Sequence, residues 1–411
     1  MRREWPAKPI ACAIRILLAV LLSQGIAAAA EVRPAFAVGV PSPTKDKPQS
    51  KLWFAHDSWW AWLPVAGGSS VWKRTADGWQ RQGHLDAPLQ GVPGQADVWA
   101  DEESATAVLV APERLAVVSL QWRQADQRYE LATPPAVLRT PPLPAGESGI
   151  ESATIARDGR GRWWVAHNWQ RGMFVRHSTD STVGAWSAPI AISTAKAAAD
   201  DLCLIVALPG SIAVVWSDQA HDAVYFRQHD DGAPPETWKP IETASSGGKT
   251  ADDHLNAAVS EDGTLYLATK NSVDALGQPQ LVLRIRHPNG AWAALPYAPR
   301  TITGEPSRPI VLLAEGSQRL FLVHSVYGND RERPRRDGIE GAHPRRDWIA
   351  WQVADRRRMD LSPAATPLLE TATRLNNVTG TKALLPAGQP WIVLVSDQRG
   401  RVFEAELAER E

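Results

Sequence analysis

The feature that most constrains this chain is an internal repeat of about 52 residues. One repeated pattern is a turn of the Asp-Gly type followed by a short apolar strand. It begins at Asp158, Asp262 and Glu315, so the intervals are 104 and 53 residues. A second pattern is a strand, a polar turn and then a tryptophan, and it ends at residues 79, 186, 238 and 292. Because both patterns share one period, they mark different strands of a single repeating unit.

Each unit has room for about four short strands joined by turns rich in Gly, Pro, Asp and Asn. No stretch has the periodicity of an amphipathic helix of normal length. Such a unit is typical of a β-propeller blade. The first strands of successive units are expected at Leu52, Val98, Ala153, Leu202, Leu255, Ile310 and Ala383. The sequence therefore predicts an all-β propeller of seven four-stranded blades, with six or eight blades as alternatives.

The last unit has room for only three strands, whereas an unassigned apolar stretch at residues 35–40 precedes the first unit. We predict that this N-terminal strand completes the last blade, because ring closure then leaves no sheet edge open. Residues 31–411 are expected to form one propeller domain. A charged insert, residues 328–347, leaves the second strand of the sixth unit. It is interpreted either as a lid over the mouth or as a solvated loop.

Residues 1–30 have the organisation of a signal peptide. Arg2, Arg3 and Lys8 form a basic start, an apolar run covers residues 16–22, and small residues follow at 27–30. We therefore expect an extracytoplasmic protein, either periplasmic or secreted. Removal of this segment leaves Cys203 as the last cysteine, so no intrachain disulfide is expected. No later segment is long and apolar enough to span a membrane.

Composition excludes some classes of function. The chain is 44% hydrophobic and 22% charged with a formal net charge of -1, which indicates a folded protein without a broad basic surface for nucleic acid. Its 19 tryptophans accompany only six phenylalanines and five tyrosines. We assign most of them to two positions in each blade, where a wide ring packs against the next blade or pins a turn. Sugar stacking by Trp59, Trp60 or Trp62 is the alternative. A monomer is expected.

The geometry of a propeller determines which polar residues lie on the same face. The loop that enters the innermost strand of a blade and the loop that leaves its second strand open on the same face, around the central channel. We call this face the mouth. Its candidate residues include Asp97, Glu151, His167, Asp201, Asp252, Asp253, His254, Lys270, Asn271, Arg308 and Lys382.

Among these residues, the run Asp252-Asp253-His254 is the most suggestive. The turn at Asp262 pairs the flanking strands antiparallel, which places His254 opposite Lys270 and Asn271. We predict His254, Asp253 and Lys270 as the catalytic group.

Arg308 and Lys382 are predicted to bind a substrate carboxylate. Further substrate contacts are assigned to Asp97, Glu151, Asp201, His167 and Asn271. The alternative is that these polar groups bond only to neighbouring blades or to water in the channel.

Metal binding is not predicted. Asp200, Asp201, Asp252 and Asp253 are oxygen ligands that suit a hard cation such as calcium, so a Ca²⁺ site is the alternative. No loop, however, has the spacing of a calcium motif, and no Cys/His cluster indicates zinc. We therefore expect no cofactor.

Three turns resemble degenerate Asp-box (BNR) repeats, in which a turn between the outer strands is pinned by a following tryptophan. They lie at residues 178–186, 229–238 and 289–292. Segments 48–54, 251–254, 308–311 and 379–382 also resemble those of bacterial sialidase-like propellers. The resemblance implies the propeller fold.

The propellers that this chain resembles include two kinds of enzyme. Sialidases need three arginines, a Tyr nucleophile paired with Glu, and an acid/base Asp, of which only Arg308 is recognised at the mouth. Polysaccharide lyases acting on uronic acids need a His or Tyr base and a cationic side chain. His254, Arg308, Lys270 and Lys382 match that requirement better.

Two functions follow as hypotheses. One is a propeller that acts on an acidic polysaccharide or glycan, as a lyase or as a glycoside hydrolase. A hydrolase would need two carboxylates about 5 Å apart for retention or wider apart for inversion, and Asp97, Glu151, Asp201 and Asp253 are eligible. The other is a non-catalytic propeller that binds glycan or protein. An enzyme predicts a deep pocket at His254 and Arg308, whereas a binder predicts a shallow or plugged mouth.

Overall fold

The computed structural model describes residues 33–407, apart from 46, 143–144, 148, 274, 329–346, 363–364, 372 and the side chain of Asn376. The predicted signal peptide and residues 329–346 of the predicted insert lie outside this part. Within the described part, no helix has the length and apolar character needed to cross a membrane.

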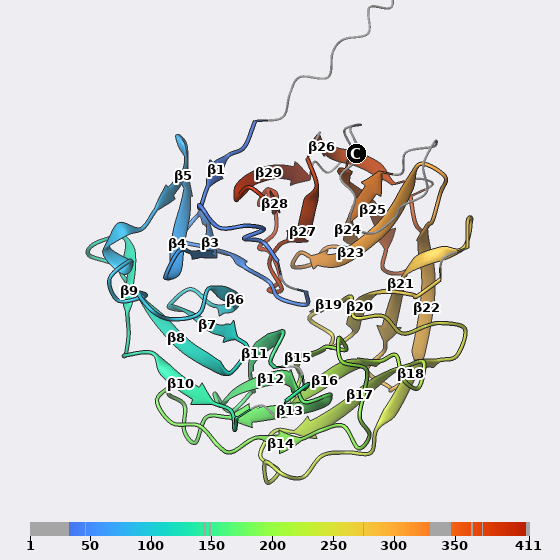
Figure 1. Ribbon diagram of the computed structural model, residues 1–411, viewed down its shortest axis with the longest axis horizontal. Helices are drawn as coiled ribbons and strands as arrows, with labels where there is room; N and C mark the ends of the chain where they lie inside the picture. The colour runs from blue at the N-terminus through green and yellow to red at the C-terminus, as the bar shows by residue number, and fades with distance from the viewer. Residues whose placement is uncertain are drawn as a thin grey trace, which may run out of the picture. The chain divides into compact units, whose positions relative to one another are not determined.

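The unit Pro34–Glu411 contains seven antiparallel sheets that follow one another in chain order around a common centre (Figure 1). Blade 1 consists of β2 (Leu52–Ala55), β3 (Ser58–Val65), β4 (Gly68–Thr75) and β5 (Gly78–Arg81), and the short 3-10 helix η1 (Gly83–Leu85) follows it. Blade 2 consists of β6 (Gln95–Ala100), β7 (Ser104–Ala111), β8 (Arg114–Arg123), β9 (Arg128–Leu131) and β10 (Ala136–Arg139). Blade 3 consists of β11 (Ala153–Arg157), β12 (Trp163–Trp169), β13 (Gly172–His177) and β14 (Ile190–Ala191).

The remaining blades repeat this plan. Blade 4 consists of β15 (Cys203–Leu208), β16 (Ser211–Asp218), β17 (Ala223–Asp230) and β18 (Glu242–Ser246). Blade 5 consists of β19 (Leu255–Val259), β20 (Leu265–Lys270), β21 (Pro279–Arg286) and β22 (Trp292–Pro299). Blade 6 consists of β23 (Gly304–Leu313), β24 (Arg319–Gly328), β25 (Asp347–Asp355) and β26 (Thr366–Thr371). Blade 7 consists of β27 (Leu375–Thr379), β28 (Trp391–Asp397), β29 (Arg401–Leu407) and the N-terminal β1 (Phe36–Ala37).

The core lies between the blades rather than in one central mass. Second strands such as β16 are buried along their whole length, because each of their faces packs against a neighbouring blade. Hydrophobic clusters join blades 1 and 2, 2 and 3, 3 and 4, 4 and 5, and 5 and 6. This arrangement explains why the inner strands read as apolar runs with polar residues at their ends.

The seven-blade count and the closure of the ring by an N-terminal strand are confirmed. In β1, Phe36 pairs with Val402 of β29, and the Phe36 ring stacks on Trp72 of blade 1 at 4.4 Å between ring centroids. The N-terminal strand therefore joins the last blade to the first.

Two details of the predicted strands were wrong. The inner strand of blade 7 is β27 and not a strand at the predicted position Ala383, because Asn376 and Asn377 give the sequence of β27 a polar character. Blade 2 has five strands rather than four, since β9 and β10 pair with opposite ends of β8.

The tryptophans follow the predicted pattern only in part. Trp186 and Trp238 each donate an indole N–H to a carbonyl three residues earlier, which pins the turn. Trp79 and Trp292 instead bond to glutamates of the adjacent blade, Glu404 and Glu242.

The distribution among blades is uneven, which corrects the expectation of two positions in each blade. Six tryptophans lie in blade 1, at positions 53, 59, 60, 62, 72 and 79. Trp59, Trp60 and Trp62 are all buried, so the sugar-stacking alternative is wrong for them.

Candidate functional site

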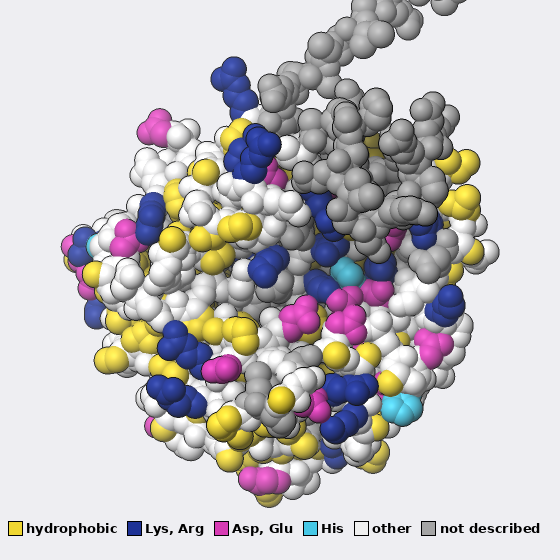
Figure 2. Space-filling view, viewed as in Figure 1, with side chains coloured by type: hydrophobic (Ala, Val, Ile, Leu, Met, Phe, Trp, Pro, Cys, Tyr) yellow, Lys and Arg dark blue, Asp and Glu magenta, His cyan; other side chains and the backbone are white. Residues whose placement is uncertain are grey.

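Predicted site residues from blades 5 and 6 meet at the mouth. Asp252, Asp253 and His254 immediately precede β19, Lys270 ends β20, and Arg308 lies in β23. The backbone N–H of Lys270 donates to the His254 carbonyl at 3.1 Å, which confirms that these residues lie opposite each other. Figure 2 shows acidic and basic side chains and a histidine grouped near the centre of the ring.

The imidazole of His254 is bound at both ring nitrogens. Its Nδ1 contacts Asp252 and lies 2.6 Å from Asp253 Oδ1, and its Nε2 lies 3.3 Å from the Ser307 hydroxyl. Lys270 Nζ donates to Asp252 Oδ2 at 2.7 Å, and Lys47 pairs with Asp253. Two carboxylates are thus balanced by two ammonium groups.

This balance leaves the imidazole neutral. Burial, together with the positive charges of Lys47 and Arg308, lowers the pKa of His254 to about 3 although Asp252 opposes the shift. Burial disfavours ionisation of Asp252, but His254 and Lys270 outweigh it and hold the pKa of this carboxyl below its usual range. His254 is therefore a neutral imidazole whose Nδ1–H is oriented by an ionised carboxylate.

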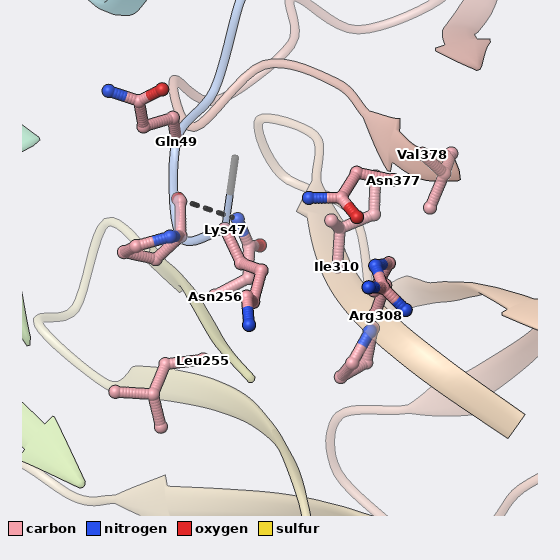
Figure 3. Close-up of a pocket in the computed structure, with 10 residues that line it drawn as sticks. Lys47, Gln49, Leu255, Asn256, Arg308, Ile310, Asn377 and Val378 are labelled. Atoms are coloured by element: carbon pink, nitrogen blue, oxygen red, sulfur yellow. Dashed lines mark hydrogen bonds between the residues drawn. The ribbon is translucent and has the colours of Figure 1, made fainter. Parts of the chain in front are cut away.

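Lys47 is a component that the sequence pattern did not reveal. It belongs to residues 47–51, a segment that follows the closing strand in the chain, passes through the channel and leads into blade 1. Gln49 Nε2 donates to the carbonyls of Gln95 and Ala153. Figure 3 shows the contact between Asn256 Nδ2 and the Pro48 carbonyl, 3.4 Å long.

The channel is filled where this segment crosses it. The cavity between the segment and Arg308 has a volume of about 10 Å³, which holds about one water molecule. Arg308 and Asn377 line this cavity from β23 and β27 (Figure 3).

Tyr327 and Arg374, which lie near Arg308, are further site residues that the sequence pattern did not reveal. Arg308 Nη1 donates to the hydroxyl of Tyr327 and, at 3.3 Å, to Ser307. The guanidinium carbons of Arg308 and Arg374 each lie 5.3 Å from the centroid of the Tyr327 ring. Burial raises the pKa of Tyr327 despite these two positive charges, so the phenol is protonated at neutral pH.

The two arginines lack a counter-charge in the described part of the chain. No carboxylate of a described residue pairs with Arg308 or Arg374, and Arg308 Nε is buried without a described hydrogen-bond partner. Arg308 also has a φ of 53° at an irregularity of β23, a conformation that costs roughly 1 kcal/mol or more in a non-glycine residue. Backbone strain of this kind clusters at functional sites, and a guanidinium without a paired carboxylate can bind an anion through two parallel hydrogen bonds.

Lys382 and Asp97 lie apart from this group. Lys382 follows β27 rather than entering it, which corrects the predicted position at the mouth and results from the misplaced inner strand. Its Nζ pairs with Asp97 and donates to the Ile155 carbonyl. Asp97 also accepts the N–H groups of Ser50 and Ile155, at 2.8 and 2.7 Å. Through these contacts the pair joins blades 2, 3 and 7 and the segment 47–51.

The other predicted residues lie on other blades or face other partners. Asp201 is buried in blade 4, accepts the Ser217 hydroxyl at 2.7 Å, and has a pKa raised by burial. His167 is buried in blade 3, and burial lowers its pKa to about 4. Glu151 is exposed at the entry to blade 3. Asn271 accepts Arg284 Nη2 at 3.0 Å. Their roles in substrate binding stay predictions.

The carboxylate and imidazole group has the composition of a metal site, although its oxygens already bind lysines. Ligand atoms of Asp252, Asp253 and His254 lie within 4.8 Å of one another. Lys47 and Lys270 contact these same carboxylates. A cation would have to displace the ammonium groups, so the absence of a metal stays our prediction.

No protein-family model and no curated protein matches this sequence. Solved structures with some likeness include a Penicillium chrysogenum α-L-arabinanase complexed with arabinobiose, at 11% identity and a TM-score of 0.44, covering 70% of this chain and 93% of that one. A Trypanosoma rangeli sialidase in complex with the inhibitor DANA has 11% identity and a TM-score of 0.44, and the match covers 73% of this chain and 56% of that one. The polysaccharide lyase Uly1 has 9% identity and a TM-score of 0.46 over 93% of both chains. These values assign no activity to this chain.

Proposed function

We propose that the protein is an exported, sialidase-like propeller that binds an acidic glycan at the mouth of blades 5 to 7. The observation that carries the proposal is the pair Arg308 and Arg374 beside Tyr327, which no described carboxylate neutralises. A guanidinium offers parallel N–H donors that match a carboxylate in two hydrogen bonds. A uronate or a similarly charged sugar is the class of ligand that fits.

Among cleavage reactions, β-elimination fits the side chains better than hydrolysis. Hydrolysis of a glycoside needs two available carboxyl groups, one of them protonated. Asp252 and Asp253 are held by lysines, Asp97 is held by Lys382 and backbone N–H groups, and Asp201 accepts donors from its own blade. None of these four carboxylates is available to a sugar in this arrangement. Glu151 is exposed, but a single carboxyl group does not make the pair that hydrolysis needs.

The residues around Arg308 supply the groups that elimination needs. Arg308 would neutralise the uronate carboxylate, and Nε2 of the neutral His254 would accept the proton at C5. The electrons of the C5–H bond then form the C4=C5 double bond while the C4–O bond breaks. The protonated phenol of Tyr327 would donate its proton to the leaving oxygen.

Binding without cleavage is the second candidate, and the filled channel favours it. His254 and Tyr327 are only 7% and 5% exposed, and the cavity beside Arg308 is about 10 Å³. Pockets that enclose small ligands are on the order of 300 Å³ or more. In this candidate the same arginines hold the glycan at the rim.

A screen of acidic polysaccharides separates the two candidates. Unsaturated uronate absorbance, new reducing ends and binding are measured for the parent, His254→Ala and Arg308→Ala. A lyase predicts absorbance that both substitutions abolish, with binding retained in His254→Ala. A binder predicts no product and loss of binding in Arg308→Ala alone. A parent that neither cleaves nor binds any acidic polymer contradicts the proposal, as does cooperative loss of stability in both variants.

A further inference from the structure

A second group of arginines lies on the mouth face at blades 2 and 3. It borders a groove of about 710 Å³ whose lining includes Pro112, Glu113, Arg114, Arg139, Pro141 and Pro142. The turn at 112–113 leaves the second strand of blade 2, and the segment after Arg139 leads to the inner strand of blade 3. Both connections therefore belong to the same face as the His254 and Arg308 group.

Two of these arginines oppose each other directly. Arg114 of β8 is the register partner of Arg139 of β10, and like charges directly opposite in an antiparallel pair are destabilising. Arg114 Nη2 donates to the Gly91 carbonyl at 2.9 Å. Neither guanidinium forms an ion pair with a carboxylate of the described residues, although Glu113 borders the same groove.

The other end of β8 provides an internal contrast. Arg123 is the register partner of Arg128 of β9, so these two residues are also a pair of opposed arginines. Those two share Glu130, whose Oε1 lies 2.7 Å from Arg128 Nη2 and whose Oε2 lies 3.6 Å from Arg123 Nε. In the described part of blade 2, one opposed pair has its counter-charge and the pair at the groove does not.

A third positive charge lies beside the groove. Arg176 of β13 is 7% exposed, and its Nη2 donates to the Arg139 carbonyl at 2.8 Å. Its Nε has no hydrogen-bond partner among the described residues, and burial lowers its pKa. A buried cation without a paired carboxylate is costly unless an anion approaches it.

The groove is held in shape by its backbone. Gly149 packs so closely on Pro112 that a Cβ atom at this position would lie 2.5 Å from the Pro112 carbonyl oxygen. The Ile150 N–H donates to that oxygen at 2.8 Å. With prolines 112, 141 and 142 in its lining, the groove needs little ordering when a ligand binds.

We infer that this groove is a second anion-binding subsite, in which Arg114 and Arg139 hold a carboxylate or sulfate group of an acidic polysaccharide. The inference rests on the proposed function and deepens it, since one long chain crossing the mouth would contact both arginine groups. Two linked contacts strengthen binding by raising the effective concentration of the second site. A short oligosaccharide with a single charge engages only one of them.

The test compares Arg114→Gln/Arg139→Gln with the control Arg123→Gln/Arg128→Gln, which removes the same charge from the same strand. The probes are a long polyuronate, a sulfated polysaccharide, a short uronate oligosaccharide and polyglutamate. We expect the affinity of the groove variant for both long polysaccharides to be about tenfold lower than that of the parent. Its affinity for the short oligosaccharide and its unfolding temperature without ligand should not fall. The control variant should match the parent for every probe.

The outcomes separate this inference from the proposed function. If the groove variant keeps the parent affinity for both long polymers while Arg308→Ala loses it, the groove inference is overturned and the proposed function stands. If polyglutamate is the ligand that depends on Arg114 and Arg139, the ligand is a polypeptide and the inference is overturned. If the parent binds none of the polysaccharides, both are overturned.

Discussion

At the scale of single residues, the mouth of blades 5 and 6 is organised around a neutral imidazole. His254 is uncharged because two ammonium groups already neutralise the two carboxylates beside it, and burial disfavours a further positive charge. The same cause acts on His167 and His324, which are buried in blades 3 and 6. Burial of neutral histidines therefore links the stability of the propeller to pH.

The pH dependence has a definite sign. Burial lowers the pKa of His324 to about 3, from an ordinary value near 6.5. Between these values the unfolded chain binds a proton that the folded protein does not, so stability falls as the pH decreases from about 6.5 towards 3. Each such histidine contributes a slope of about 1.4 kcal/mol per pH unit within its window. Denaturation of the parent and His324→Gln over this range should show a slope smaller by that amount in the variant, whereas equal slopes would refute the assignment.

Asp97 is a buried carboxylate whose removal we expect to destabilise the propeller. Its carboxylate is 0% exposed and holds Lys382 and two backbone N–H groups. Asp97→Asn leaves the largely buried ammonium of Lys382 without its counter-charge, so we expect a loss of about 3 kcal/mol of unfolding free energy.

The double variant Asp97→Asn/Lys382→Met is the control for Asp97→Asn, because it removes the unpaired charge and should recover part of the loss. Urea denaturation measures both variants. Normal stability of Asp97→Asn combined with loss of glycan binding would assign Asp97 to the substrate site instead.

At the scale of elements, two segments decide what the mouth contains. The N-terminal β1 closes blade 7, and the segment that follows carries Lys47 into the channel, where it meets Asp253. The inner strand β27 places Arg374 immediately before its first residue. Arg374 follows the rule for mouth residues, and recognition of β27 would have revealed it.

Ring closure by β1 depends on aromatic packing against blade 1. Phe36 stacks on Trp72 and lies 5.7 Å from Trp79 between ring centroids. Phe36→Ala removes the contact between the closing strand and blade 1, so we expect a loss of about 2 kcal/mol. The control Val137→Ala alters a strand residue that is 49% exposed and should change stability little. Faster hydrogen exchange of β29 in Phe36→Ala would locate the effect, and parental stability of this variant would contradict the role of Phe36.

At the scale of the whole molecule, the sequence predicts the ring better than the site. The turn and tryptophan periods reflect packing that each blade repeats, so the number of blades and the closing strand follow from them. His254 opposite Lys270 was predictable for the same reason, because one turn fixes that register.

The remaining site residues arise from contacts between distant segments. Lys47 lies 206 residues from Asp253, in a segment without periodicity. Tyr327 lies one residue before the end of β24, and Arg374, which lies over its ring, comes from the next blade. Such contacts depend on how the blades close around the channel and leave no mark in local sequence.

The central claim is that Arg308 binds the anionic group of a glycan. It is tested most directly by the affinity of one acidic polysaccharide for the parent, Arg308→Ala and Arg357→Ala, the last replacing an exposed arginine in the turn after β25. Loss of a charge-assisted pair predicts about 10- to 100-fold weaker binding in Arg308→Ala, with parental affinity in Arg357→Ala. Equal affinity of Arg308→Ala and the parent would contradict the claim.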